Sequence, residues 1–89
     1  MRELLVETKS EEDAQGEACT CSYYVLVDEM EVAGGFACES YGVKVALDGE
    51  AVSIPNITTS VTRIDALMEL LTRNFVTPST LRDVIEDWL

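Results

Sequence analysis

Apolar and polar residues alternate most regularly in residues 41–54, on both sides of the dipeptide Asp48-Gly49. Asp-Gly favours a two-residue hairpin turn of type I′, because the positive φ angles of that turn match the twist of the paired strands. The turn sets the register of the hairpin. In that register two apolar pairs share one side of the sheet: Val45 with Val52, and Val43 with Ile54.

Two earlier segments also have the composition of strands. Residues 20–27 are rich in aromatic and β-branched side chains and are apolar on both faces, which is typical of a strand covered on both sides. Residues 2–8 could form a first strand, although Leu5 interrupts the alternation. The polar residues 9–18 predict a loop or flexible turn, and the acidic residues 28–40 predict a long hairpin connection. We expect Pro55 to end the last strand, because proline cannot donate to a neighbouring strand.

The remaining residues have the three- and four-residue spacing of amphipathic helices. A first helix is predicted over residues 61–73, with Thr59 or Ser60 as its N-cap and Asn74 in the left-handed position that ends a helix. Its predicted buried stripe consists of Val61, Ile64, Leu67, Met68, Leu71 and Phe75.

A second, short helix is predicted to follow a tight corner. Thr77 would be its N-cap, and Pro78 would occupy the first turn, where the missing N–H of proline costs nothing. Its apolar stripe is predicted to contain Leu81, Val84, Ile85, Trp88 and Leu89.

These elements predict an α+β fold, in which an antiparallel sheet of three or four strands is followed by two C-terminal helices packed on one face. A chain of 89 residues is long enough for one core, so residues 1–89 are expected to form a single domain. Residues 1–19 make up an acidic N-terminal segment that could be flexible.

The charge of the chain excludes several classes of partner. The net charge is −11, and residues 1–31 carry nine acidic and two basic residues, a net charge of −7. Direct nucleic-acid binding and attachment to an anionic membrane are therefore not expected, whereas a basic protein partner is permitted. No apolar run approaches the ~20 residues of a membrane-spanning helix, and no signal peptide is recognisable. We expect a cytoplasmic protein.

The sequence gives little support for catalysis. It contains no histidine, which removes the commonest general base and the usual neutral metal ligand. Cys19, Cys21 and Cys38 could supply three metal ligands, but Cys-x-Cys is not a typical zinc spacing and a fourth ligand is missing. The simpler interpretation is that these cysteines are small, partly buried side chains without a chemical role. We therefore predict no catalytic residue, no metal site, no cofactor and no enzymatic activity.

The second face of the predicted sheet is a candidate contact surface. If the helices cover one face, the other leaves a flat, weakly charged patch for a partner protein or a second copy. Alternatively, the N-terminal segment folds over this patch. The residues predicted to bind a partner are Tyr24, Leu26, Gly42, Lys44, Ala46, Ala51 and Ser53.

Three short motifs resemble a family of proteins. They are Tyr23-Tyr24, Tyr41-Gly42-Val43, and the corner that runs from Asn74 through Thr77-Pro78 to Trp88. Together they resemble a small Firmicutes family, mostly clostridial, of unknown function, over roughly residues 20–89. The resemblance implies a bacterial cytoplasmic origin and no catalytic residue.

Two functions fit these observations. The first is a non-enzymatic protein-interaction module of a bacterial cytoplasm, which binds a protein partner or forms a homo-oligomer. The second is an acidic inhibitor whose carboxylates occupy the basic nucleic-acid-binding groove of a target protein.

Overall fold

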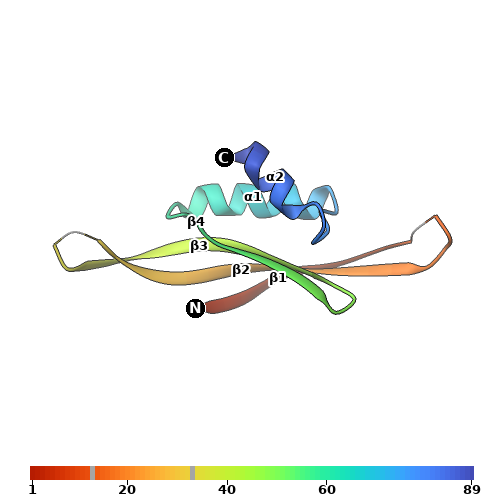
Figure 1. The fold of residues 1–89 in the computed structure, drawn as a ribbon, viewed down its shortest axis with the longest axis horizontal. Helices are drawn as coiled ribbons and strands as arrows, with labels where there is room; N and C mark the ends of the chain where they lie inside the picture. Colours follow the sequence, from red (N-terminus) through yellow and green to blue (C-terminus); the bar gives the residue numbers. More distant parts are fainter. Residues whose placement is uncertain (13, 33) are drawn as a thin grey trace.

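The computed structural model describes residues 1–12, 14–32 and 34–89, and shows four strands followed by two helices (Figure 1). The antiparallel sheet has the order β1-β2-β3-β4, so each strand pairs with the next strand in the chain. The predicted α+β fold is confirmed. The elements are β1 (Arg2–Glu12), β2 (Ala18–Val32), β3 (Phe36–Leu47), β4 (Glu50–Thr58), α1 (Val61–Arg73) and α2 (Leu81–Trp88).

Both helices lie on one face of the sheet, and the sheet extends beyond them at both ends (Figure 1). The molecule measures 56 × 23 × 18 Å, and its long axis follows the strands. One end is the β1–β2 hairpin and the other end is the β2–β3 hairpin (Figure 1). The predicted loops at residues 9–18 and 28–40 are therefore wrong, because most of the described residues in both segments continue the strands. Cross-strand hydrogen bonds hold these polar residues in strands without any apolar burial.

The core lies between the helices and the apolar face of β2, β3 and β4. The buried residues of this core are Cys21, Tyr23, Val43, Val45, Ile64, Leu67, Met68, Leu71, Val76, Leu81 and Ile85. Two polar contacts connect the sheet to the helices. The buried Tyr23 hydroxyl donates to the Val76 carbonyl over 2.9 Å, and the Lys9 ammonium donates to the Thr72 carbonyl at the end of α1 over 2.7 Å.

The β3–β4 hairpin has the predicted register, in which Val45 pairs with Val52 and Val43 with Ile54. Asp48 and Gly49 both have positive φ angles, as a type I′ turn requires. The prediction that Pro55 ends the strand is wrong, because β4 continues to Thr58. Proline is accommodated because the pairing shifts between Val43 and Tyr41, which leaves Pro55 in an irregularity of an edge strand.

The predicted span of α1 is confirmed, and Ser60 is its N-cap, since the Ser60 hydroxyl accepts a hydrogen bond from the Arg63 N–H over 3.2 Å. The left-handed residue after α1 is Phe75 (φ 47°) and not Asn74, which has φ −95° and uses its side-chain amide to donate to the Leu70 carbonyl. In the predicted stripe, Val61 is exposed.

The predicted start of α2 is also wrong. Residues 78–80 form a turn in which the Thr80 N–H donates to the Thr77 carbonyl over 3.2 Å, and the helix begins at Leu81 with Thr80 as its N-cap. Thr77 and Pro78 therefore start the turn that leads into the helix. Leu89, predicted to be buried, is exposed, because it follows the last helical residue.

Candidate functional site: the open face of the sheet

The sheet face opposite the helices, called the open face from here on, holds all seven residues that were predicted to bind a partner. The strand register places them there, because they alternate along each strand with the core residues. Neighbouring strands bring them together in four pairs: Tyr24 with Lys44, Leu26 with Gly42, Lys44 with Ser53, and Ala46 with Ala51.

Two of the seven residues offer almost no surface to a partner. Leu26 is 2% exposed, and Gly42 is also buried. A Cβ atom on Gly42 would lie 2.5 Å from the Pro55 Cα, so the backbone of β4 passes directly beside this glycine. A partner on the open face would therefore contact the other five residues, Tyr24, Lys44, Ala46, Ala51 and Ser53.

Lys44 is the charged centre of the open face. Its ammonium donates to the Glu3 carboxylate over 2.7 Å and lies 5.2 Å from the centre of the Tyr24 ring. The hydrogen bond to Glu3 raises the pKa of Lys44, so the amine keeps its positive charge. Because the carboxylate compensates this charge, the centre of the open face is close to neutral in a chain of net charge −11.

Leu5 also belongs to the open face, and the sequence analysis missed it. It pairs with Tyr24 across β1 and β2, and 59% of it is exposed. The sequence does contain a signal, because Leu5 breaks the alternation of the first strand. The structure shows that the β1–β2 register shifts between Leu5 and Glu7, so Val6 is an extra residue at a bulge.

The N-terminal segment does not fold over the open face. Its described residues up to Glu12 form β1, which pairs with β2 along the edge of the sheet and widens the open face (Figure 1). The alternative in which this segment covers the patch is therefore wrong for residues 1–12.

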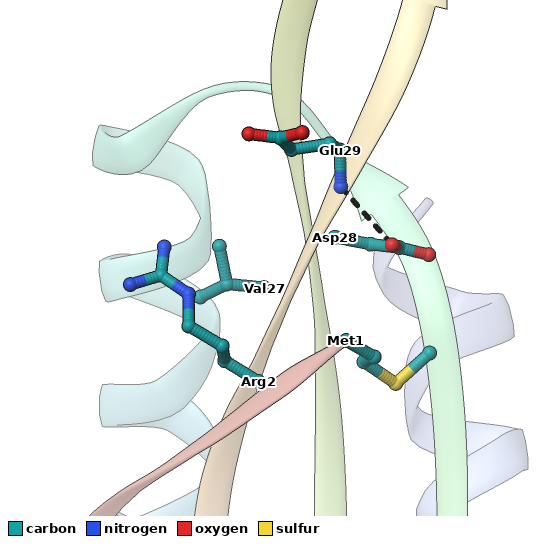
Figure 2. Close-up of a pocket in the computed structure, with 5 residues that line it drawn as sticks. All are labelled: Met1, Arg2, Val27, Asp28 and Glu29. Carbon is teal, nitrogen blue, oxygen red and sulfur yellow. Dashed lines mark hydrogen bonds between the residues drawn. The ribbon is translucent and has the colours of Figure 1, made fainter.

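A hollow lies at the start of β1, where that strand runs beside β2 (Figure 2). Figure 2 shows that Arg2, Val27 and the Glu29 carboxylate lie to one side of the strands, while Met1 and Asp28 point to the other. The Arg2 guanidinium contacts the Glu39 carboxylate at 3.4 Å. The polar side chains around the hollow are therefore divided between the two faces of the sheet, and on the Arg2 side the cation already has a carboxylate partner in Glu39.

The three cysteines are free, and Cys38 lies far along the sheet from Cys19 and Cys21. Cys19 and Cys21 pair with β1 residues, whereas Cys38 pairs with Met30 near the opposite end of β2. Positions 21 and 30 are nine residues apart along β2, a distance of roughly 30 Å. Burial raises the pKa of the Cys21 thiol, which makes it a poor thiolate ligand. Within residues 1–12, 14–32 and 34–89, no three potential metal ligands form a group.

The comparisons with known proteins identify a family and no activity. In the parts of the chain that the structure describes, no helix is long and apolar enough to cross a membrane. The comparisons with curated proteins and with solved structures gave no match. Residues 2–89 match a family of unknown function (DUF6514), and the chain therefore belongs to that family.

Proposed function

We propose that this chain is a non-enzymatic protein-interaction module of a bacterial cytoplasm, and that it binds a partner protein through the open face. The observation that carries the proposal is that both helices lie on the other side of the sheet, which leaves the exposed Ala51 and Ser53 and the half-buried Tyr24 without a covering element (Figure 1). The lack of histidine favours binding over catalysis.

The composition of the open face suits a protein contact. Tyr24 is half-buried and lies beside the Lys44 ammonium, and tyrosine is enriched where interfaces gain most of their energy. Ala46 and Ala51 are small and lie opposite each other, so a partner can approach the backbone closely at this end. The internal Lys44–Glu3 pair leaves no uncompensated charge to be buried at the centre of such a contact.

Affinity capture from a clostridial lysate would test the proposal, because the short motifs resemble a clostridial family. The bait would be the full chain, with nuclease treatment, and each capture would be analysed by mass spectrometry at low and high salt. We expect a stoichiometric partner that resists high salt and is lost when Ala51→Glu is the bait. Thr62→Glu, which is exposed on the helix side, should retain it. A partner captured equally by both variants, or no stoichiometric partner together with a monomeric chain, would contradict the proposal.

A second candidate function is an acidic inhibitor that occupies a basic nucleic-acid-binding groove of a target protein. The favouring observation is that Glu29 and Glu39 lie directly opposite each other in the β2–β3 hairpin, with Glu31 two residues further along the same strand. Like charges placed opposite each other destabilise a sheet, and the Arg2 guanidinium, which contacts the Glu39 carboxylate at 3.4 Å, offsets only part of that cost. These three carboxylates are exposed near one end of the 56 Å molecule.

The same capture experiment distinguishes the inhibitor from the interaction module. A nucleic-acid-binding partner that is released by high salt, and that is lost from a Glu29→Gln, Glu31→Gln double variant, would support the inhibitor. A partner that ignores this double variant but requires the open face would exclude it.

A further inference from the structure

β1 forms one outer edge of the sheet, and three consecutive apolar residues are exposed along it. Leu4 is 49% exposed, Leu5 59% and Val6 50%. Leu4 pairs with Val25 and lies on the helix side of the sheet, whereas Leu5 pairs with Tyr24 and lies on the open face. A partner on the open face would cover Leu5 and leave Leu4 in water. Only a partner that lies alongside the edge covers both residues.

An added strand has the shape that this edge requires. The outer N–H and C=O groups of an edge strand are available to pair with another chain, and an added strand places side chains on both faces of the sheet at once. Natural edges are usually short, charged or interrupted by proline. β1 has 11 residues, no proline and an apolar triplet. Its charged residues lie on either side of that triplet, so within the triplet the edge is interrupted by the bulge at Val6 alone. We therefore expect this edge to be covered in the functional protein.

The charges of β1 indicate which strand can cover it. Both charged residues in its first half are already compensated within the chain, Arg2 by Glu39 and Glu3 by Lys44. The second half carries the exposed Glu7, Glu11 and Glu12. In an antiparallel pair of β1 strands centred on Leu4, Leu4 faces Leu4 of the second copy and Glu3 faces Leu5, so the compensated half of each strand lies against the apolar triplet of the other. The acidic second halves of the two β1 strands then point to opposite ends of the pair. Two chains of net charge −11 can therefore meet here without placing one acidic residue opposite another.

We propose that β1 pairs antiparallel with β1 of a second copy of this chain around Leu4–Val6, which joins two four-stranded sheets into one continuous sheet. This contact does not use the open face. It leaves Tyr24 and Ala51 free for the partner proposed above.

Sedimentation equilibrium over a range of concentrations tests the proposal with the full chain. The wild type should form a dimer. Leu4→Lys and Leu5→Lys should each raise the dimer dissociation constant at least about tenfold, because each removes a leucine contact from both copies and adds two charges. Leu89→Lys, the same change at a leucine that is 72% exposed outside the edge, should leave the dissociation constant unchanged. Ala51→Lys, on the open face, should also leave it unchanged.

Amide hydrogen exchange provides a second readout that needs no variant. Exchange at residues 2–7 should slow as the wild-type concentration rises, while exchange at residues 50–53 should not. A dimer that is sensitive to Ala51→Lys and Leu5→Lys but not to Leu4→Lys would place the contact on the open face, which overturns the edge proposal and leaves the proposed function intact. A wild type that stays monomeric at millimolar concentration would overturn the edge proposal as well, and a captured partner would then decide the function separately.

Discussion

Replacing Gly42 by alanine is the sharpest test of how closely the backbone of β4 packs beside β3. An added Cβ atom would lie 2.5 Å from the Pro55 Cα and would also overlap the Ile54 carbonyl oxygen. Both atoms belong to the backbone of β4, so no side-chain rotation can relieve the overlap. Gly42 does not have a positive φ angle, and its requirement is therefore space rather than conformational freedom.

The expected loss of stability follows from the shift of the β4 backbone that the added Cβ atom requires. Backbone shifts forced by overpacking cost roughly 1–3 kcal/mol and occasionally more, and this site is at the upper end because the overlap is with two backbone atoms. We expect a loss of about 3 kcal/mol from a total stability of roughly 4–13 kcal/mol for a chain of this length. The corresponding fall in the unfolding midpoint is about 12–24 °C. The shift would also displace Pro55 and the residues that lead into α1.

Urea denaturation followed by circular dichroism would measure the loss. Gly35→Ala is the matched control, because the added Cβ has no neighbour within 4 Å and only the positive φ of 80° is unfavourable. That control should cost about 1–2 kcal/mol. A Gly42→Ala variant that is no less stable than Gly35→Ala would refute the reasoning about the close approach of β4.

Four further predictions rest on single contacts or on single buried groups. Tyr23→Phe should lower the free energy of unfolding in urea by about 1–3 kcal/mol, because the buried Val76 carbonyl loses its hydrogen-bond donor. Burial raises the pKa of Tyr23 and of Cys21. Both groups keep their protons in the folded chain at a pH where the unfolded chain has lost them. The free energy of unfolding should therefore fall as the pH rises above the ordinary pKa values, 9.0 for Cys21 and 10.0 for Tyr23, and it should fall less in Tyr23→Phe. Urea titrations between about pH 8 and 10.5 would detect this. Ser60→Ala should cost about 1 kcal/mol in thermal unfolding by removing the N-cap of α1, whereas Thr59→Ala should not. Glu29→Lys should stabilise the chain by about 0.2–1 kcal/mol, because it replaces a like-charge pair with Glu39 by an opposite-charge pair, and an unchanged or lower midpoint would contradict this.

The sequence predicted the elements whose apolar pattern is periodic. The β3–β4 register follows from Asp48-Gly49, and the span of α1 follows from its stripe and from Ser60. The ends of the β1–β2 and β2–β3 hairpins could not be predicted in this way. Their residues are polar and acidic, and they lie in strands because each backbone pairs with its neighbour, which leaves no periodic signal in the side chains.

The sequence predicted the corner between α1 and α2 in the right segment, but it assigned the left-handed conformation to the wrong residue. Phe75, and not Asn74, takes the left-handed conformation, because the Val76 N–H donates to the Leu71 carbonyl and Val76 itself is buried. For the open face, alternation placed all seven residues on one side correctly. It could not show that Gly42 is buried, because that depends on the close approach of the β4 backbone, nor that its cross-strand partner Leu26 is buried.

The length of the sheet supports a contact function better than a stabilising one. Ordering each backbone residue costs roughly 1–2 kcal/mol, and an isolated two-stranded hairpin is marginal in water. The ends of both hairpins lie beyond the helices and bury no core residue (Figure 1). The β2–β3 end instead presents Phe36, which is 73% exposed, and the exposed residues Glu29, Glu31 and Glu39. Folding alone gives no reason for this extension, whereas binding a partner along a 56 Å surface does. The functional surface should therefore extend along the sheet beyond the helices, and variants near the hairpin ends should affect binding more than stability.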